Sequence, residues 1–109
     1  MDTKTNDSVE LFNSYCDGEK IHITCSLHAD EFVLLRESTG ELTQWCFGEV
    51  PHCSETHIDT QGIQKLMNYF DSDSIEKFFD ILLTEFSVFD ADVQLQNLCE
   101  DLGICYTVR

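Results

Sequence analysis

The sequence predicts an α+β protein, because strand-like and helix-like apolar patterns are grouped in separate parts of the chain. Residues 20–50 read as strands, and residues 60–103 have the apolar spacing of amphipathic helices. We expect an antiparallel sheet of three to four strands with helices packed mainly on one face, in the order α-βββ-ααα-β. The length predicts that residues 1–109 form a single acidic domain.

The first element expected is a helix over Asp7–Cys16. Asp7, with Glu10 three residues later, has the spacing of a capping box. The apolar positions that share one face of this helix are Val9, Phe12 and Cys16. Gly18 follows where a helix stop is expected.

Three strands are expected next. Apolar and polar residues alternate with a period of two in Lys20–His28, and Glu31–Glu37 has an apolar centre. Leu42–Val50 is the third expected strand. Short turns at residues 29–30 and 38–41 separate these runs, so we expect an antiparallel meander.

Residues 51–60 are expected to form a loop that leads into three helices. The apolar positions of the three helices are Ile63, Leu66, Met67 and Phe70, then Ile75, Phe78, Phe79, Leu82 and Phe86, and finally Ala91, Leu95, Leu98, Cys99 and Leu102. Thr60, Asp73 and Asp90 are the expected N-caps, and a glycine closes the third helix. The tail Ile104–Val108 is rich enough in strand-forming residues to add a fourth strand.

The charge of the chain restricts its partners. Twenty-one acidic residues against six basic ones give a formal net charge of −15. Such a charge opposes direct binding to nucleic acid or to an anionic membrane, and it attracts cationic partners. The polar N-terminus and the lack of an apolar run of about 20 residues predict a cytoplasmic protein with reduced cysteines.

The net negative charge is densest in the second half of the chain, where residues 66–108 hold nine acids and one base. About half of these acids fall in first helical turns, where carboxylates oppose the helix dipole. Glu76 and Asp80, one turn apart, repel each other. The residues expected to contact a basic partner are Glu76, Asp80, Glu85, Glu100 and Asp101, with Trp45 and Tyr69 as aromatic anchors.

A weak metal-binding pattern lies between residues 46 and 57. Its four possible ligands are Cys46, His52, Cys53 and His57. Their spacing matches no known arrangement of paired zinc ligands, so no cofactor is expected. The acidic pairs lack the glycine of a calcium loop, and no catalytic motif is present, so an enzyme is not expected either.

These observations favour a small acidic inhibitor that neutralises a basic partner protein. The first expectation is an immunity protein or antitoxin that blocks a toxin nuclease, because nuclease sites are basic. The alternative is a nucleic-acid mimic of the phage type, which inhibits a DNA- or RNA-binding protein of host defence or repair. A small zinc-binding module is a second alternative.

Overall fold

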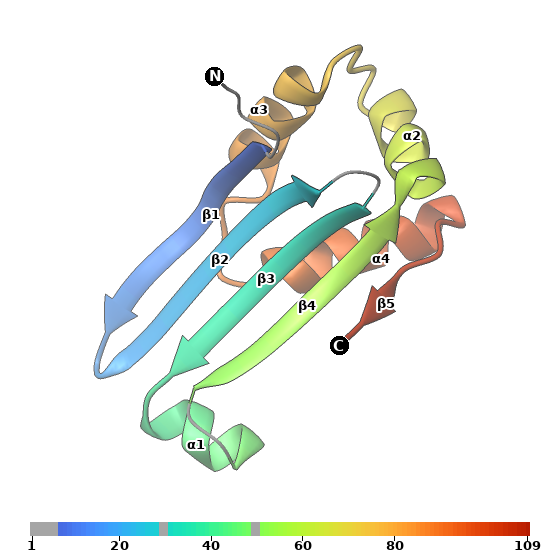
Figure 1. The fold of residues 1–109 in the computed structure, drawn as a ribbon. Helices are drawn as coiled ribbons and strands as arrows, with labels where there is room; N and C mark the ends of the chain where they lie inside the picture. Colours follow the sequence, from blue (N-terminus) through green and yellow to red (C-terminus); the bar gives the residue numbers. More distant parts are fainter. Residues whose placement is uncertain (1–6, 29–30, 49–50) are drawn as a thin grey trace.

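The computed structural model describes residues 7–28, 31–48 and 51–109. It shows an α+β fold in which β1 to β5 form one antiparallel sheet in sequential order (Figure 1). The elements are β1 (Asp7–Cys16), β2 (Glu19–His28), β3 (Glu31–Thr39), α1 (Glu41–Phe47), β4 (His52–Asp59), α2 (Thr60–Tyr69), α3 (Ile75–Glu85), α4 (Ala91–Leu102) and β5 (Thr107–Val108). The predicted class is confirmed, whereas the predicted order and strand number are wrong.

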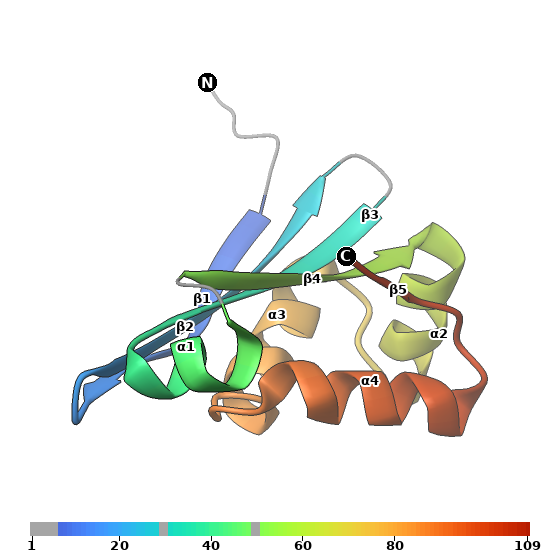
Figure 2. The same cartoon turned by 90° about the horizontal axis from the view of Figure 1, so that it is seen from below.

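The helices lie on one side of the sheet. Figure 2 shows α2, α3 and α4 beneath the sheet. Helix α1 lies at one end of the sheet, where it connects the end of β3 to the start of β4. The core fills the space between sheet and helices. Phe32 of β3 meets Phe78 of α3 edge to face, with ring centroids 5.9 Å apart. Among the described residues, no helix is both long and apolar enough to cross a membrane.

The predicted helix over Asp7–Cys16 is wrong, since these residues form strand β1. The following Asp17 and Gly18 both have positive φ, 54° and 80°, as a two-residue hairpin turn with a primed geometry requires. This turn folds β1 back onto β2. A β-bulge between Glu10 and Phe12 shifts the register of the pairing.

Two further predictions are wrong. The expected strand Leu42–Val50 is wrong, because its residues 42–47 belong to helix α1, and its last two residues lie outside the described residues. The expected loop at 51–60 contains strand β4, which pairs with β3 and buries Ile58 completely. The polar sequence of β4 has a low intrinsic strand propensity. It forms a strand because it lies inside the sheet, where it pairs with both β3 and β5 and packs against the helices.

Strands β2 and β3 and helices α2, α3 and α4 are confirmed within a few residues. The caps of α2 and α3 lie one residue from the predicted positions. Asp59 accepts a hydrogen bond from the Gly62 amide at 2.9 Å, and Ser74 accepts one from the Lys77 amide at 3.1 Å. The tail adds β5, a fifth strand and not a fourth.

Candidate partner-binding site

Helix α1 is held against the β1–β2 hairpin by one carboxylate. Its N-cap, Gly40, has no side chain to accept hydrogen bonds from the first turn. Glu19 of β2 takes that role, because its carboxylate oxygens accept from the amides of Leu42 at 2.8 Å and Thr43 at 3.1 Å. The Thr43 hydroxyl also donates to it. A side chain from a neighbouring strand therefore caps and positions α1.

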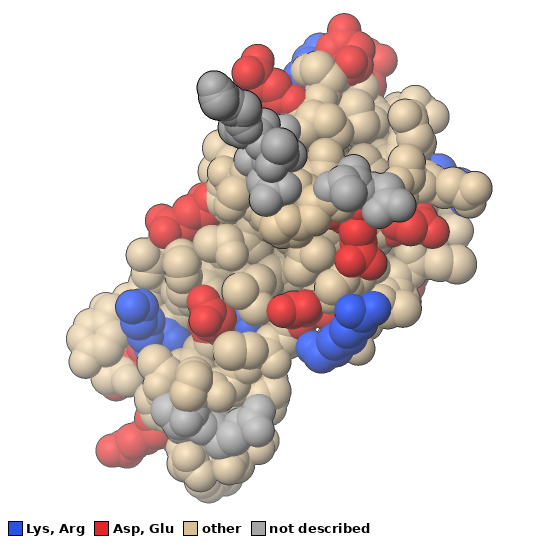
Figure 3. Space-filling view, in the orientation of Figure 1, with Lys and Arg blue, Asp and Glu red and all other residues tan. Residues whose placement is uncertain are grey.

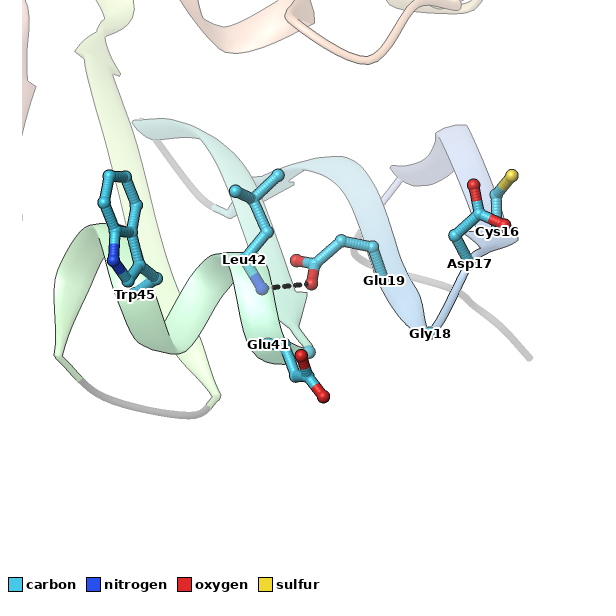
Figure 4. A pocket seen from close by; sticks show the side chains of 8 residues that line it. Cys16, Asp17, Gly18, Glu19, Glu41, Leu42 and Trp45 are labelled. Carbon is cyan, nitrogen blue, oxygen red and sulfur yellow. Dashed lines mark hydrogen bonds between the residues drawn. The ribbon is translucent and has the colours of Figure 1, made fainter.

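This arrangement presents an apolar surface at one end of the molecule. Leu42 and Trp45 are three residues apart on α1 and share one face. The Trp45 side chain is 84% exposed and Leu42 is 59% exposed. Figure 4 shows both pointing to the same side of α1. They line an open hollow of about 900 Å³ that the β1–β2 hairpin turn also lines.

Two acidic residues line the same hollow as Leu42 and Trp45. Asp17 stands on the hairpin turn across the hollow from Trp45, and Glu41 extends from the first residue of α1 (Figure 4). Both residues are exposed. An exposed indole beside carboxylates suits a partner that offers an apolar pocket with basic groups around it. We call Asp17, Glu41, Leu42 and Trp45 the α1 surface.

The sequence-based site residues do not form one patch. Trp45 lies on α1, whereas Tyr69, which is 57% exposed, ends α2 at the opposite end of the molecule (Figure 1). Glu76 and Asp80 of α3 line a groove beside β1. Glu85, the last residue of α3, is exposed.

Glu100 and Asp101 lie in the last turn of α4, which ends beside β5 at the other edge of the sheet (Figure 1). Glu100 accepts a 2.6 Å hydrogen bond from the Tyr106 hydroxyl, and this bond raises the pKa of Tyr106. Figure 3 shows that the acids on the uncovered face of the sheet are separated from one another and mixed with basic side chains. Contact of the five predicted acids with a partner stays a prediction.

The candidate ligands Cys46, His52, Cys53 and His57 do not converge. Cys46 is exposed on α1, and Cys53 is exposed on β4. His52 stacks on Phe47 at 3.8 Å between ring centroids. His57 lies buried between carboxylates, 3.0 Å from Glu31 and 2.8 Å from Glu55. In the described ranges, no three side chains of His, Cys, Asp or Glu are arranged to hold a metal ion.

The six cysteines form a buried group and an exposed group, which a thiol titration can distinguish. Burial raises the pKa of Cys25 to about 12 and that of Cys99 to about 11, and both side chains are inaccessible. The other cysteines are exposed: Cys16, Cys46, Cys53 and Cys105. With a disulfide reagent near pH 8, we expect four thiols to react in the folded protein and six after unfolding.

Cys16→Ser is the control for this titration, because it should lower only the count of fast thiols, from four to three. Rapid reaction of all six thiols in the folded protein would contradict the burial of Cys25 and Cys99.

The chain matches no protein-family model, no curated protein and no solved structure. Its own side chains therefore carry the functional argument. Among the sequence-predicted anchors, only Trp45 belongs to the α1 surface, and sequence reasoning missed its neighbours Asp17, Glu41 and Leu42. The Asp17-Gly18 pair is typical of a two-residue hairpin turn, so it could have predicted the hairpin that lines this surface.

Proposed function

We propose that the protein is a stoichiometric inhibitor that binds a basic partner through the α1 surface, as an immunity protein or antitoxin binds a toxin nuclease. The observation that carries the proposal is the 84% exposure of Trp45 at a hollow that Asp17 and Glu41 also line. Tryptophan dominates the centres of many protein interfaces. Trp45 is the single tryptophan of the chain, and its large apolar side chain is exposed to water. Covering it with a partner surface is therefore favourable in free energy.

Charge supplies the second part of the argument. A net charge of −15 accelerates encounter with a basic protein and disfavours acidic competitors. The catalytic surface of a nuclease is basic because it binds phosphates, so an acidic protein seated on it excludes the substrate. Inhibition of this kind needs one inhibitor chain per nuclease and no catalytic activity of the inhibitor.

The separation of the acids counts against a nucleic-acid mimic, and it also means that the five predicted acids do not form one compact inhibitor patch. A mimic needs carboxylates in a continuous stripe that replaces phosphates along a groove. Here Glu76 and Asp80 lie at the β1 edge, whereas Glu100 and Asp101 lie beside β5 (Figure 1). The α1 surface instead combines an exposed tryptophan with two acidic residues that line the same hollow.

Capture experiments with matched baits test the proposal. The wild-type protein should retain a basic protein from its source organism, and Trp45→Ala should weaken that complex by about 2 kcal/mol, or roughly 30-fold. Phe89→Ala is the control, because Phe89 is another exposed aromatic residue, 59% exposed, outside the α1 surface. Calorimetry with the recovered partner gives both affinities and the stoichiometry.

The recovered partner should be a nuclease whose activity falls to zero at one equivalent of inhibitor. Equal retention of the partner by the wild-type and Trp45→Ala proteins would show that the α1 surface is not the binding site. A partner of acidic character would remove the electrostatic basis of the proposal.

A further inference from the structure

A second surface lies at the free edge of the sheet. Strand β1 lies at one edge of the sheet, and among the described residues it pairs only with β2. Helix α3 lies alongside β1 (Figure 1). Residues of both elements line a groove of about 270 Å³. The groove is lined by Ser8, Val9, Glu76, Phe79 and Asp80.

The strand wall of this groove has unused hydrogen-bonding capacity. Alternate residues of an edge strand direct their N–H and C=O groups away from the sheet. In the part of the chain that the structure describes, no backbone hydrogen bond reaches β1 from any element other than β2. An extended segment placed here can therefore continue the sheet as an additional strand.

The helix wall supplies charge with a spacing that fits such a strand. Glu76 and Asp80 are exposed and four residues apart on α3, which places them about 6 Å apart along the helix axis. In a strand, side chains on one face are two residues apart, at about 6.8 Å. Two basic residues at alternate positions of an added strand can therefore reach both carboxylates.

We propose that the groove between β1 and α3 binds an extended basic segment of a partner protein. The segment pairs with β1 through its backbone, and alternate Lys or Arg side chains meet Glu76 and Asp80. This second surface is separate from the α1 surface, so it stands whether or not the proposed inhibitor function is correct.

A second copy of the chain is the less favourable occupant of the edge. Two copies with a charge of −15 each repel one another. A basic segment relieves the repulsion between Glu76 and Asp80, which a second acidic chain would increase.

The first test measures binding of a labelled peptide of about nine residues in which lysine and valine alternate, by fluorescence anisotropy in about 150 mM salt. The double variant Glu76→Gln/Asp80→Asn should bind it about tenfold more weakly. The matched control, Asp71→Asn/Asp73→Asn, removes the same charge from exposed residues between α2 and α3 and should change affinity less than about twofold. Equal loss in both double variants would overturn the proposal, because it would show attraction to net charge alone.

The second test examines the backbone. Two versions of the peptide carry N-methyl groups at alternate residues. One is methylated at the odd-numbered residues and the other at the even-numbered residues, so each lacks the N–H donors along one edge of the strand. Binding should be lost for the peptide methylated on the edge that faces β1 and retained for the other. Equal binding of both peptides would overturn strand addition. A dimer of the free protein in sedimentation that the peptide dissociates would assign the edge to a second copy and would also overturn the proposal.

Discussion

Replacement of Arg36 by methionine should lower the free energy of unfolding by about 3 kcal/mol, measured by urea denaturation. Arg36 of β3 points toward the helices, and its guanidinium lies 3.7 Å from a carboxylate oxygen of Asp92 on α4. The two side chains are only 23% and 10% exposed. Methionine keeps much of the arginine stem but leaves Asp92 as an unpaired, buried charge, which is strongly destabilising.

The double variant Arg36→Met/Asp92→Leu separates charge from packing. It removes both charges and should recover most of the lost stability, since an apolar pair often replaces a buried ion pair at little cost. A double variant no more stable than Arg36→Met would contradict this account. So would a change of less than about 0.5 kcal/mol in the single variant, which is typical of exposed ion pairs.

The elements that could be predicted from the sequence are those whose own residues dictate their shape. In α3, Ile75, Phe78 and Leu82 recur at helical spacing, and the last two are fully buried against the sheet. In β2, the alternation places Ile23 and Cys25 in the core. For these segments the local pattern and the tertiary packing agree.

Strand β1 was missed because a bulge hides its alternation. Between Glu10 and Phe12 the pairing shifts by one residue, so Leu11 and Phe12 both contact the core. This shift leaves Val9 and Phe12 at helical spacing. Only pairing with β2 through the Asp17-Gly18 turn distinguishes the strand from a helix, and that pairing is a contact between segments.

The α1 surface was only partly predictable. Trp45 could be selected by residue type, as large aromatic side chains are common interface anchors. Its acidic neighbours could not be, because Asp17 is brought close by the hairpin and Glu41 by a helix that was expected to be a strand. The acids chosen from helix positions on α3 and α4 instead lie at separate edges.

Gly40→Ala should destabilise the protein by about 2 to 3 kcal/mol and release α1 from the hairpin. Gly40 has φ 137° and ψ 179°, a conformation essentially restricted to glycine. A Cβ there would lie 2.5 Å from the Gly18 carbonyl oxygen and 2.1 Å from a Glu19 carboxylate oxygen. Moving Glu19 aside would remove the acceptor for the first amides of α1, so the clash and the loss of the cap act together.

Gly48→Ala is the matched control, because it makes the same change at the other end of α1. Gly48 also has positive φ, 73°, but a Cβ there meets nothing within 4 Å, so only about 1 kcal/mol of backbone strain is expected. Trp45 is the single tryptophan, and its anisotropy decay reports the motion of α1 directly. The decay should become faster in Gly40→Ala and stay close to wild type in Gly48→Ala. If both variants lost the same stability and kept the wild-type decay, the close approach of Gly40 to the hairpin would not be what fixes α1, and the α1 surface would lose its structural basis.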